Sequence, residues 1–198
     1  MITSESTSAP AELNEELGGV VFTLGLDSFF QTNTAQAAQM LELVRAGLDL
    51  QAGERLLDAY GGVGTFGLPL AQGLKEVVVL EENPAAVADG KRSAEANGLF
   101  NADFIQGPVE RVLPALDTHF DAAVLDPPRR GCHPAALAAL VLLRPQRIAY
   151  ISCHPGILAR DLGPLLQAGY HLRSVQPIDM FPQTPISSVL FCSNSSSI

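Results

Sequence analysis

The sequence predicts an α/β domain built on a doubly wound, Rossmann-like sheet that is mostly parallel and ends in an antiparallel edge hairpin. Short apolar runs alternate with longer stretches of helical periodicity, which is the pattern of consecutive strand–helix units. The last two apolar runs are separated by a loop alone, as in a hairpin at a sheet edge. A chain of 198 residues, 47% of them hydrophobic, can enclose one substantial core.

The two ends of the chain lack an apolar pattern. Residues 1–17 are rich in Ser, Thr, Glu and Ala and predict a flexible tail, and residues 193–198 predict a disordered one. The folded domain is therefore expected at residues 18–192. An extended stretch at Val20–Leu24 precedes a helix at Thr34–Leu48, for which Thr34 is the expected N-cap.

The alternating region follows this helix. Strands are expected at Arg55–Ala59, Val77–Leu80, Phe104–Ile105, Ala122–Leu125, Arg147–Ile151, Leu172–Pro177 and Ser188–Cys192. Helices are expected at Thr65–Gly73, Pro84–Ala96, Val109–Leu116, Pro134–Leu143 and Gly156–Ala168. Functional residues of such sheets lie at the carboxyl ends of strands, and the informative motifs of this sequence stand there.

Composition excludes several classes of protein. The formal net charge is −9, and residues 1–44 hold six acids and no Lys or Arg, so a self-sufficient nucleic-acid binder is not expected. If the substrate is a nucleic acid, a local basic patch or another domain must contact its phosphates. The longest apolar run, Ala135–Leu143, is too short to span a bilayer, and residues 1–10 do not resemble a signal peptide. Three Cys without a CxxC pair favour a reducing, cytoplasmic setting and indicate no metal site.

A glycine loop follows the first strand of the alternating region. Gly62, Gly64 and Gly67 match GxGxxG, which allows a tight turn and close approach of a nucleotide-type cofactor. Glu81 ends the next strand, where a carboxylate can accept hydrogen bonds from ribose hydroxyls of either NAD or S-adenosylmethionine. Asp58 before the glycines favours S-adenosylmethionine, because it would repel a pyrophosphate. The alternative is a packing turn with solvated acids at the strand ends.

A second motif follows the strand Ala122–Leu125. Two prolines after Asp126 fix the backbone and hold that carboxylate rigidly at the sheet edge. A rigid acceptor beside a cofactor could bind the N–H edge of a base flipped out of its stack. Arg129 and Arg130 could bind phosphate. The alternative is a helix-start turn that carries two surface arginines.

A third motif supplies a candidate nucleophile. Cys153 stands at the end of the strand Arg147–Ile151 and just before a helix N-terminus, whose dipole favours a thiolate, and His154 could assist. A thiolate is suited to conjugate attack on a pyrimidine ring. Cys132 and Cys192 fit the ordinary role of small buried apolar residues.

In these motifs the sequence resembles the RNA uracil-C5 methyltransferase family, S-adenosylmethionine-dependent enzymes that make 5-methyluridine in rRNA or tRNA. The similarity covers roughly Phe22 to Val189, and six motifs occur in order, at residues 29–33, 58–67, 81, 126–129, 152–155 and 179–185. The resemblance implies a methyltransferase catalytic domain at residues 18–192, with RNA as partner. It also implies cofactor contacts by Gln31, Tyr60, Thr65, Glu81 and Asp126, and Cys153 as nucleophile.

The reaction implied by the resemblance is methylation of C5 of a uridine, with rRNA favoured over tRNA. The thiolate adds to C6, C5 takes the sulfonium methyl group, a general base removes the C5 proton, and elimination frees the cysteine. Asp126 would orient the uracil as well as contact the cofactor.

The sequence departs from the family pattern in three ways. The family's last motif continues with a His and a Glu, the general base, where this chain reads Ile186-Ser187-Ser188-Val189. The family's N-terminal RNA-binding domain and an inserted middle segment do not fit into 198 residues. Gly61 and His154 replace a Cys and an Asn. The chain is therefore interpreted as a catalytic half, a truncated product or a decayed copy whose RNA-binding domain is separate or missing.

Three other functions are weighed against a methyltransferase of uracil C5. A decayed relative would bind S-adenosylmethionine or RNA without turnover, because the general base is absent. An NAD-dependent oxidoreductase is supported only by the glycine loop and Glu81. An exocyclic-amine methyltransferase also has a proline-rich acidic turn, but it normally continues with an aromatic residue that stacks on the base, whereas Arg129 follows here.

Overall fold

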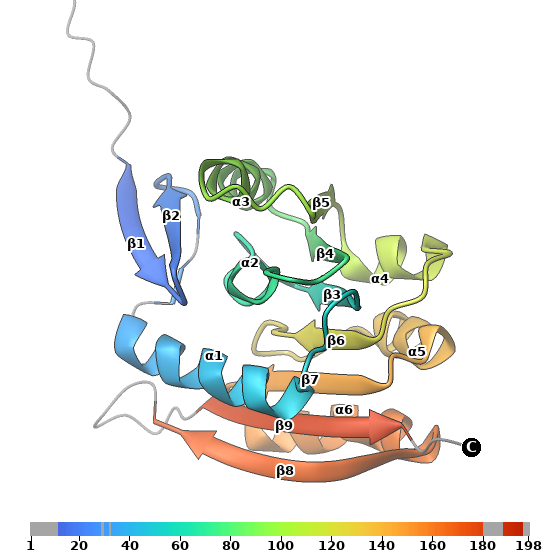
Figure 1. Cartoon of the computed structure of the whole chain (residues 1–198). Helices are drawn as coiled ribbons and strands as arrows, with labels where there is room; N and C mark the ends of the chain where they lie inside the picture. Colours follow the sequence, from blue (N-terminus) through green and yellow to red (C-terminus); the bar gives the residue numbers. More distant parts are fainter. Residues whose placement is uncertain (1–11, 29, 32, 180–187, 196–198) are drawn as a thin grey trace, which may run out of the picture.

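A computed structural model of the chain describes residues 12–28, 30–31, 33–179 and 188–195 (Figure 1). Its centre is a seven-stranded sheet with the order β5-β4-β3-β6-β7-β9-β8. The five strands from β3 to β7 run parallel, and β9 pairs antiparallel with both β7 and β8. The strands are β3 (Arg55–Ala59), β4 (Glu76–Glu81), β5 (Ala102–Gln106), β6 (Ala122–Leu125), β7 (Arg147–Ser152), β8 (Tyr170–Ile178) and β9 (Ser188–Ser195). The predicted mostly parallel sheet with an antiparallel edge hairpin is thus confirmed.

Helices cover both faces of this sheet, as expected for a doubly wound fold (Figure 1). Strand residues alternate between the two faces: Leu56 packs into one apolar cluster and Leu57 into the other. One cluster also contains residues of α1, α2 and α3, and the other contains residues of α4, α5 and α6. The helices are α1 (Thr34–Leu48), α2 (Gly67–Leu70), α3 (Pro84–Ala96), α4 (Val109–Val112), a 3-10 turn (Leu113–Ala115), α5 (Pro134–Leu143) and α6 (Pro155–Gln167).

Part of the expected N-terminal tail is a β-strand. β1 (Leu13–Leu17) pairs antiparallel with β2 (Val20–Leu24), and the expectation of a loose segment through residue 17 is corrected. Gly18 and Gly19 both have positive φ angles, 58° and 83°, as a two-residue hairpin turn requires. The Gly18-Gly19 pair is the feature of the sequence that indicates this hairpin. The hairpin is stabilised by burial of Leu17 against the main domain.

Other boundaries differ from expectation for local reasons. The N-cap of α1 is Asn33, whose side chain accepts from Gln36 N, and not Thr34. α2 is one short turn, because the glycine loop continues through Thr65. The expected helix at 109–116 splits after Val112, where Pro114 has no N–H to continue the α-helical hydrogen bonds. β9 continues to Ser195, since it is paired on both sides, so the predicted tail from residue 193 starts too early.

None of the described helices is long and apolar enough to cross a bilayer. Within the same residues, no group of three or more His, Cys, Asp and Glu side chains is arranged to hold a metal ion.

Candidate functional site

The register of the parallel strands brings the three predicted motifs to one edge of the sheet. Ala59 pairs with Leu80 on one side and with Leu125 on the other, and Leu125 pairs with Tyr150. The loops that follow these strands therefore leave the sheet side by side, as the carboxyl-end rule predicts.

A cavity of about 480 Å³ lies at this edge. It is lined by nearly every residue that the sequence analysis predicts to bind the cofactor or the substrate. Those residues are Gln31, Tyr60, Gly62, Thr65, Glu81, Asp126, Arg129, Arg130 and Cys153. The lining also includes residues that the sequence reasoning missed, namely Gly61, Glu82, Asn83, Ala86, Val109, Glu110, Pro127, Pro128 and Ile151.

The conformation of the glycine loop depends on two residues with left-handed backbone angles and on hydrogen bonds to Glu81. Tyr60 has a φ of 62°, unusual for a residue with a side chain, and Gly62 has a φ of 58°. Glu81 Oε2 accepts a hydrogen bond from Gly62 N at 3.0 Å, and its Oε1 accepts from Asn83 N at 2.8 Å. Nothing lies within 4 Å of a Cβ placed on Gly62, so a ligand can approach the backbone closely there.

Gly64 does not line this cavity. A Cβ on Gly64 would stand 2.8 Å from Leu68 Cγ and 3.0 Å from Phe104 Cζ, in the packed interior. Its φ of 83° adds a conformational requirement for glycine. Gly64 is thus a packing residue of the turn, and the glycine pattern alone could not distinguish it from Gly62.

Asp58 also lies outside the cavity, so its carboxyl group does not face a cofactor there, contrary to expectation. Its side chain is fully buried beneath the loop, where Oδ2 accepts from Gly67 N at 2.8 Å. A Cβ on Gly61 would stand 2.8 Å from Asp58 Cγ, so that glycine makes room for the carboxyl group. Burial, reinforced by the negative charge of Glu81, raises the pKa of Asp58 to about 7.

Asp126 is a half-buried carboxyl group in the wall of the cavity. Its backbone N–H donates to Ala59 O at 3.3 Å, which ties the loop to β3, and its Oδ2 lies 3.5 Å from Gln31 Nε2. Removal from water, with the nearby negative charge of Asp58, raises the pKa of Asp126 to about 7. A carboxyl group with such a pKa can either accept or donate a proton near neutral pH.

Cys153 is half-buried and lines the same cavity from the end of β7. The next residue, His154, is the N-cap of α6, and its Nδ1 accepts from Ile157 N at 3.3 Å. The His154 imidazole was expected to assist the Cys153 thiolate. In the structure it caps the N-terminus of α6 instead. Cys132, by contrast, is buried, and burial raises its pKa to about 12, which keeps that thiol neutral.

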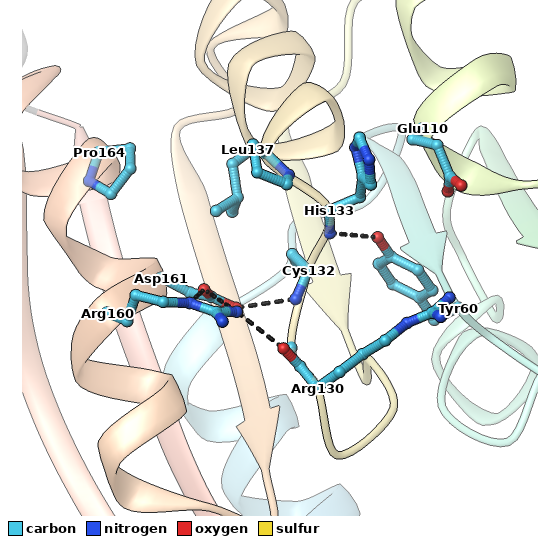
Figure 2. A pocket seen from close by; sticks show the side chains of 11 residues that line it. Tyr60, Glu110, Arg130, Cys132, His133, Leu137, Arg160, Asp161 and Pro164 are labelled. Carbon is cyan, nitrogen blue, oxygen red and sulfur yellow. Dashed lines mark hydrogen bonds and ion pairs between the residues drawn. The ribbon is translucent and has the colours of Figure 1, made fainter.

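A second cavity, of about 500 Å³, adjoins the first (Figure 2). The two share Tyr60, Glu110 and Arg130. The other residues of the second cavity come from the loop after β6 and from α5 and α6; they are Gly131, Cys132, His133, Pro134, Leu137, Arg160, Asp161 and Pro164.

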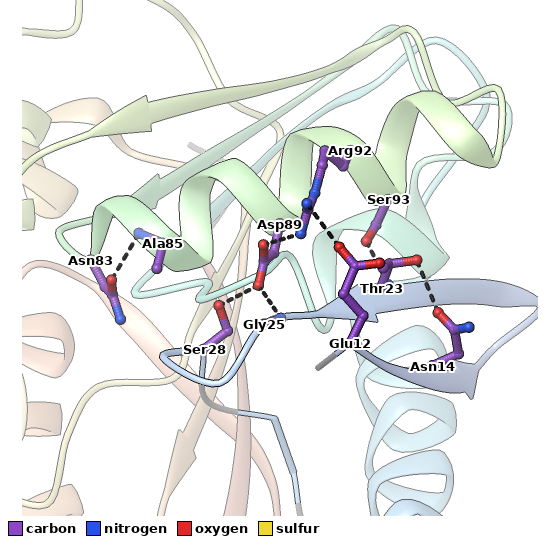
Figure 3. A network of polar contacts seen from close by, with 10 residues as sticks. All are labelled: Glu12, Asn14, Thr23, Gly25, Ser28, Asn83, Ala85, Asp89, Arg92 and Ser93. Carbon is purple, nitrogen blue, oxygen red and sulfur yellow. Dashed lines mark hydrogen bonds and ion pairs between the residues drawn. The ribbon is translucent and has the colours of Figure 1, made fainter. Parts of the chain in front are cut away.

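The segment that carries Gln31 to the first cavity is fastened to α3 by a polar network (Figure 3). Asp89 is buried, and its Oδ2 accepts from Gly25 N at 2.7 Å and from Ser28 Oγ at 2.5 Å. Asn83 Nδ2 donates to Asp27 O at 3.0 Å. Phe29 and Thr32 of the same motif lie outside the described residues. No local pattern indicates this network, because its partners are distant along the chain.

The last motif of the resemblance, at residues 179–185, lies outside the described residues except for Asp179. The strand that follows it returns to the site: Val189 of β9 pairs with Ser152 of β7. The antiparallel register thus brings the backbone of Ser188 level with Cys153. Ser187 lies outside the described residues.

The chain is similar to known proteins along most of its length. A family model described as tRNA (uracil-5-)-methyltransferase matches residues 19–192. An uncharacterized RNA methyltransferase of Synechocystis sp. is 46% identical over 171 residues, which are 86% of this chain and 37% of that protein. One of Halalkalibacterium halodurans is 40% identical over 86% of this chain and 38% of its own. The chain therefore spans less than two fifths of the length of these relatives.

Solved structures show the same fold. The crystal structure of a Pyrococcus abyssi tRNA (uracil-54, C5)-methyltransferase in complex with S-adenosyl-L-homocysteine matches with a TM-score of 0.80 and 34% identity, over 92% of this chain and 44% of that one. M. jannaschii TYW2 in complex with AdoMet matches in fold, with a TM-score of 0.67 and 17% identity, over 94% of this chain and 86% of that one.

Proposed function

The chain belongs to the tRNA (uracil-5-)-methyltransferase family, and from this premise we propose that it carries out S-adenosylmethionine-dependent methylation of C5 of a uridine in RNA. One observation carries the proposal. The thiol of Cys153 and the carboxyl group of Asp126 line the same cavity as the glycine loop and Glu81. Nucleophile, base-binding group and cofactor-binding groups thus share one space of about 480 Å³.

The residues present fit S-adenosylmethionine. The cavity wall carries the carboxyl groups of Glu81, Glu82, Glu110 and Asp126, which suit the cationic sulfonium and amino group of this cofactor. Gly62 leaves room for a ligand against the loop, and Glu81 stands where ribose hydroxyls would be bound. The Pyrococcus abyssi relative holds S-adenosyl-L-homocysteine, which supports the same assignment. These features favour a methyltransferase over an NAD-dependent oxidoreductase.

When bound, S-adenosylmethionine supplies an electrophilic methyl group. The chain's own residues do the rest of the work in this proposal. Cys153 forms a bond from Sγ to C6 of the uracil, which places electron density on C5. Asp126 hydrogen-bonds the uracil and, through Gln31, is held in position. Loss of the C5 proton to a base then allows the Sγ–C6 bond to break and frees the thiol.

The proposed substrate class is RNA, with rRNA as our first choice and tRNA as the competing substrate. The Pyrococcus abyssi relative is named for uridine 54 of tRNA, so both RNAs belong in the assay. The phosphate contacts are assigned to Arg129 and Arg130 and to an RNA-binding domain outside this chain. Free thiols at Cys132 and Cys153 are consistent with the proposed cytoplasmic location.

A relative that binds cofactor or RNA without turnover is the second candidate, and one observation favours it. The chain has no Asp or Glu after Asp179, so there is no carboxylate where the family's general base follows the last motif. A chain of this kind would bind S-adenosylmethionine or RNA, and no methylated product would accumulate.

The test is covalent capture. The protein is mixed with S-adenosylmethionine and an RNA whose target uridine is replaced by 5-fluorouridine, and intact mass is measured. Fluorine cannot leave C5 as a cation, so the adduct needs the nucleophile and the methyl group but no general base. We expect a methylated adduct with the wild type and with Cys132→Ala, and none with Cys153→Ala. Absence of an adduct from the wild type, with S-adenosyl-L-homocysteine still bound, would favour the second candidate.

A further inference from the structure

The reaction proposed above uses the first cavity and leaves the second without a role. The second cavity, of about 500 Å³, opens directly beside the first and shares the wall formed by Tyr60, Glu110 and Arg130. Its size lies within the range of sites that bind small organic molecules. A polymer whose target unit occupied the first cavity would bring an adjoining unit to the second.

Three exposed arginines lie around the two cavities, beside the carboxyl groups that also line them. The net charge is −9, and residues 1–44 contain no Lys or Arg. Arg129 and Arg130, from the loop after β6, and Arg160, from α6, are exposed around the two cavities, together with His133. Exposed guanidinium groups of this kind can bind the phosphate groups of a polyanion.

The basic groups of the second cavity are held in place by a buried carboxylate. Asp161 is 2% exposed, and its Oδ2 accepts from Cys132 N at 2.8 Å and from Tyr150 Oη at 2.5 Å. Its Oδ1 accepts from Arg160 Nε at 2.7 Å, while Arg160 Nη2 donates to Arg130 O at 2.8 Å. The loop after β6 is thereby fastened to α6, so the second cavity is formed before any ligand arrives.

The remaining lining suits a nucleobase. Tyr60, Leu137 and Pro164 offer apolar surface for the face of a ring, and Glu110 offers a carboxylate to exocyclic amino groups. Figure 2 shows the side chain of Arg130 extending toward Tyr60, with Arg160 and Asp161 on the opposite side. The cavity thus combines an aromatic ring, a hydrogen-bond acceptor and guanidinium groups, which is the chemistry that single-stranded RNA requires.

We propose that the second cavity binds the nucleotide that adjoins the target uridine in single-stranded RNA. The inference rests on the proposed function, because it takes the first cavity as the site of the target. It gives the catalytic domain a recognition element of its own, so that substrate choice does not depend only on a separate RNA-binding domain.

The test blocks the second cavity without touching the first. Pro164 is exposed at its rim and does not line the first cavity, so Pro164→Trp should fill it. Leu166→Trp is the matched control, since Leu166 is exposed on the same helix and lines neither cavity. Binding of a fluorescent heptaribonucleotide with a central uridine is measured with S-adenosyl-L-homocysteine present. We expect Pro164→Trp to weaken binding about tenfold and the control to change it little.

A second readout locates the neighbour directly. The same oligonucleotide carries 4-thiouridine one position before or after the central uridine, and the cross-linked peptides are identified. Cross-links to residues 130–137 or 160–164 support the proposal, and Pro164→Trp should remove them. Equal binding by all three proteins, no binding by the wild type, or cross-links elsewhere would overturn it.

The two proposals fail in distinguishable ways. If the reaction is wrong, the 5-fluorouridine adduct is absent while Pro164→Trp still weakens RNA binding. If the second cavity is wrongly assigned, the adduct forms at the same rate in Pro164→Trp and Leu166→Trp.

Discussion

Gln31 Nε2 lies 3.5 Å from Asp126 Oδ2, so the segment before α1 contacts the loop after β6 across 95 positions of sequence. This pair closes one side of the cavity in which the proposed reaction takes place. Its geometry depends on residues that do not touch a substrate, because the segment that carries Gln31 is fastened to α3 by Asp89.

Asp89 is therefore expected to act on the cofactor site through Gln31. Asp89→Asn removes a carboxylate that accepts from Gly25 N and Ser28 Oγ. We expect the Kd for S-adenosyl-L-homocysteine, measured by calorimetry, to rise about tenfold. Asp103→Asn, an exposed change on β5, should leave it unaltered. Once Gln31→Ala is present, Asp89→Asn should have little further effect; full additivity would contradict the coupling.

Glu81 should contribute more to cofactor affinity than its neighbour. Glu81→Gln removes a charged acceptor that is held by Gly62 N and Asn83 N, and we expect the Kd for S-adenosyl-L-homocysteine to rise between about tenfold and about a hundredfold. Glu82→Gln removes the same charge from an exposed position of the same cavity and should change the Kd by less than about twofold. Equal effects would mean that only net charge matters.

Asp58 should make stability depend on pH. Its folded-state pKa of about 7 lies above the ordinary value of 3.8, so the folded state holds the proton more tightly than the unfolded state. The stabilisation is complete below pH 3.8 and is lost as the pH rises through about 7. The free energy of unfolding of the wild type should fall relative to Asp58→Asn by about 1.4 kcal/mol per pH unit in that window.

Urea denaturation of both proteins at several pH values measures this difference. Asp58→Asn is the suitable comparison, because an amide oxygen can still accept from Gly67 N. Parallel curves from pH 4 to pH 7 would refute the proton linkage.

Gly64 should matter for packing, in contrast to its expected role at the cofactor. Gly64→Ala places a Cβ 2.8 Å from Leu68 Cγ at a φ of 83°, whereas Gly73→Ala meets nothing within 4 Å at a φ of 81°. Both changes strain the backbone by about 1 kcal/mol. The difference in their free energies of unfolding isolates the clash, and we expect Gly64→Ala to lose about 1–3 kcal/mol more.

Ser188 stands where a general base could be restored. The pairing of Val189 with Ser152 brings the backbone of Ser188 level with Cys153. Under the proposed mechanism, Ser188→Glu should raise the yield of released 5-methyluridine at least about a hundredfold, the lower end of the range typical of general-base catalysis. Nucleoside mass spectrometry measures the product, and Ser188→Gln is the control without a base. Equal yields from the two variants would show that proton removal is not the limiting step.

The parallel sheet and most of the residues that line the first cavity could be predicted from the amino-acid pattern. Apolar runs mark strands locally, and residues at strand carboxyl ends must converge in a doubly wound sheet. Tyr60, Glu81, Asp126 and Cys153 could therefore be brought together from the sequence without knowing a single contact.

Features that depend on partners distant in sequence could not be predicted, because no local pattern marks them. β1 forms because β2 pairs with it and the domain buries Leu17, and Asp89 acts on residues that precede it by more than 60 positions. Gly62 and Gly64 belong to the same glycine pattern. A Cβ on Gly62 would face open space, whereas a Cβ on Gly64 would meet Leu68. Periodicity reports which face a residue occupies, but packing alone decides whether that face meets a ligand, a side chain or water.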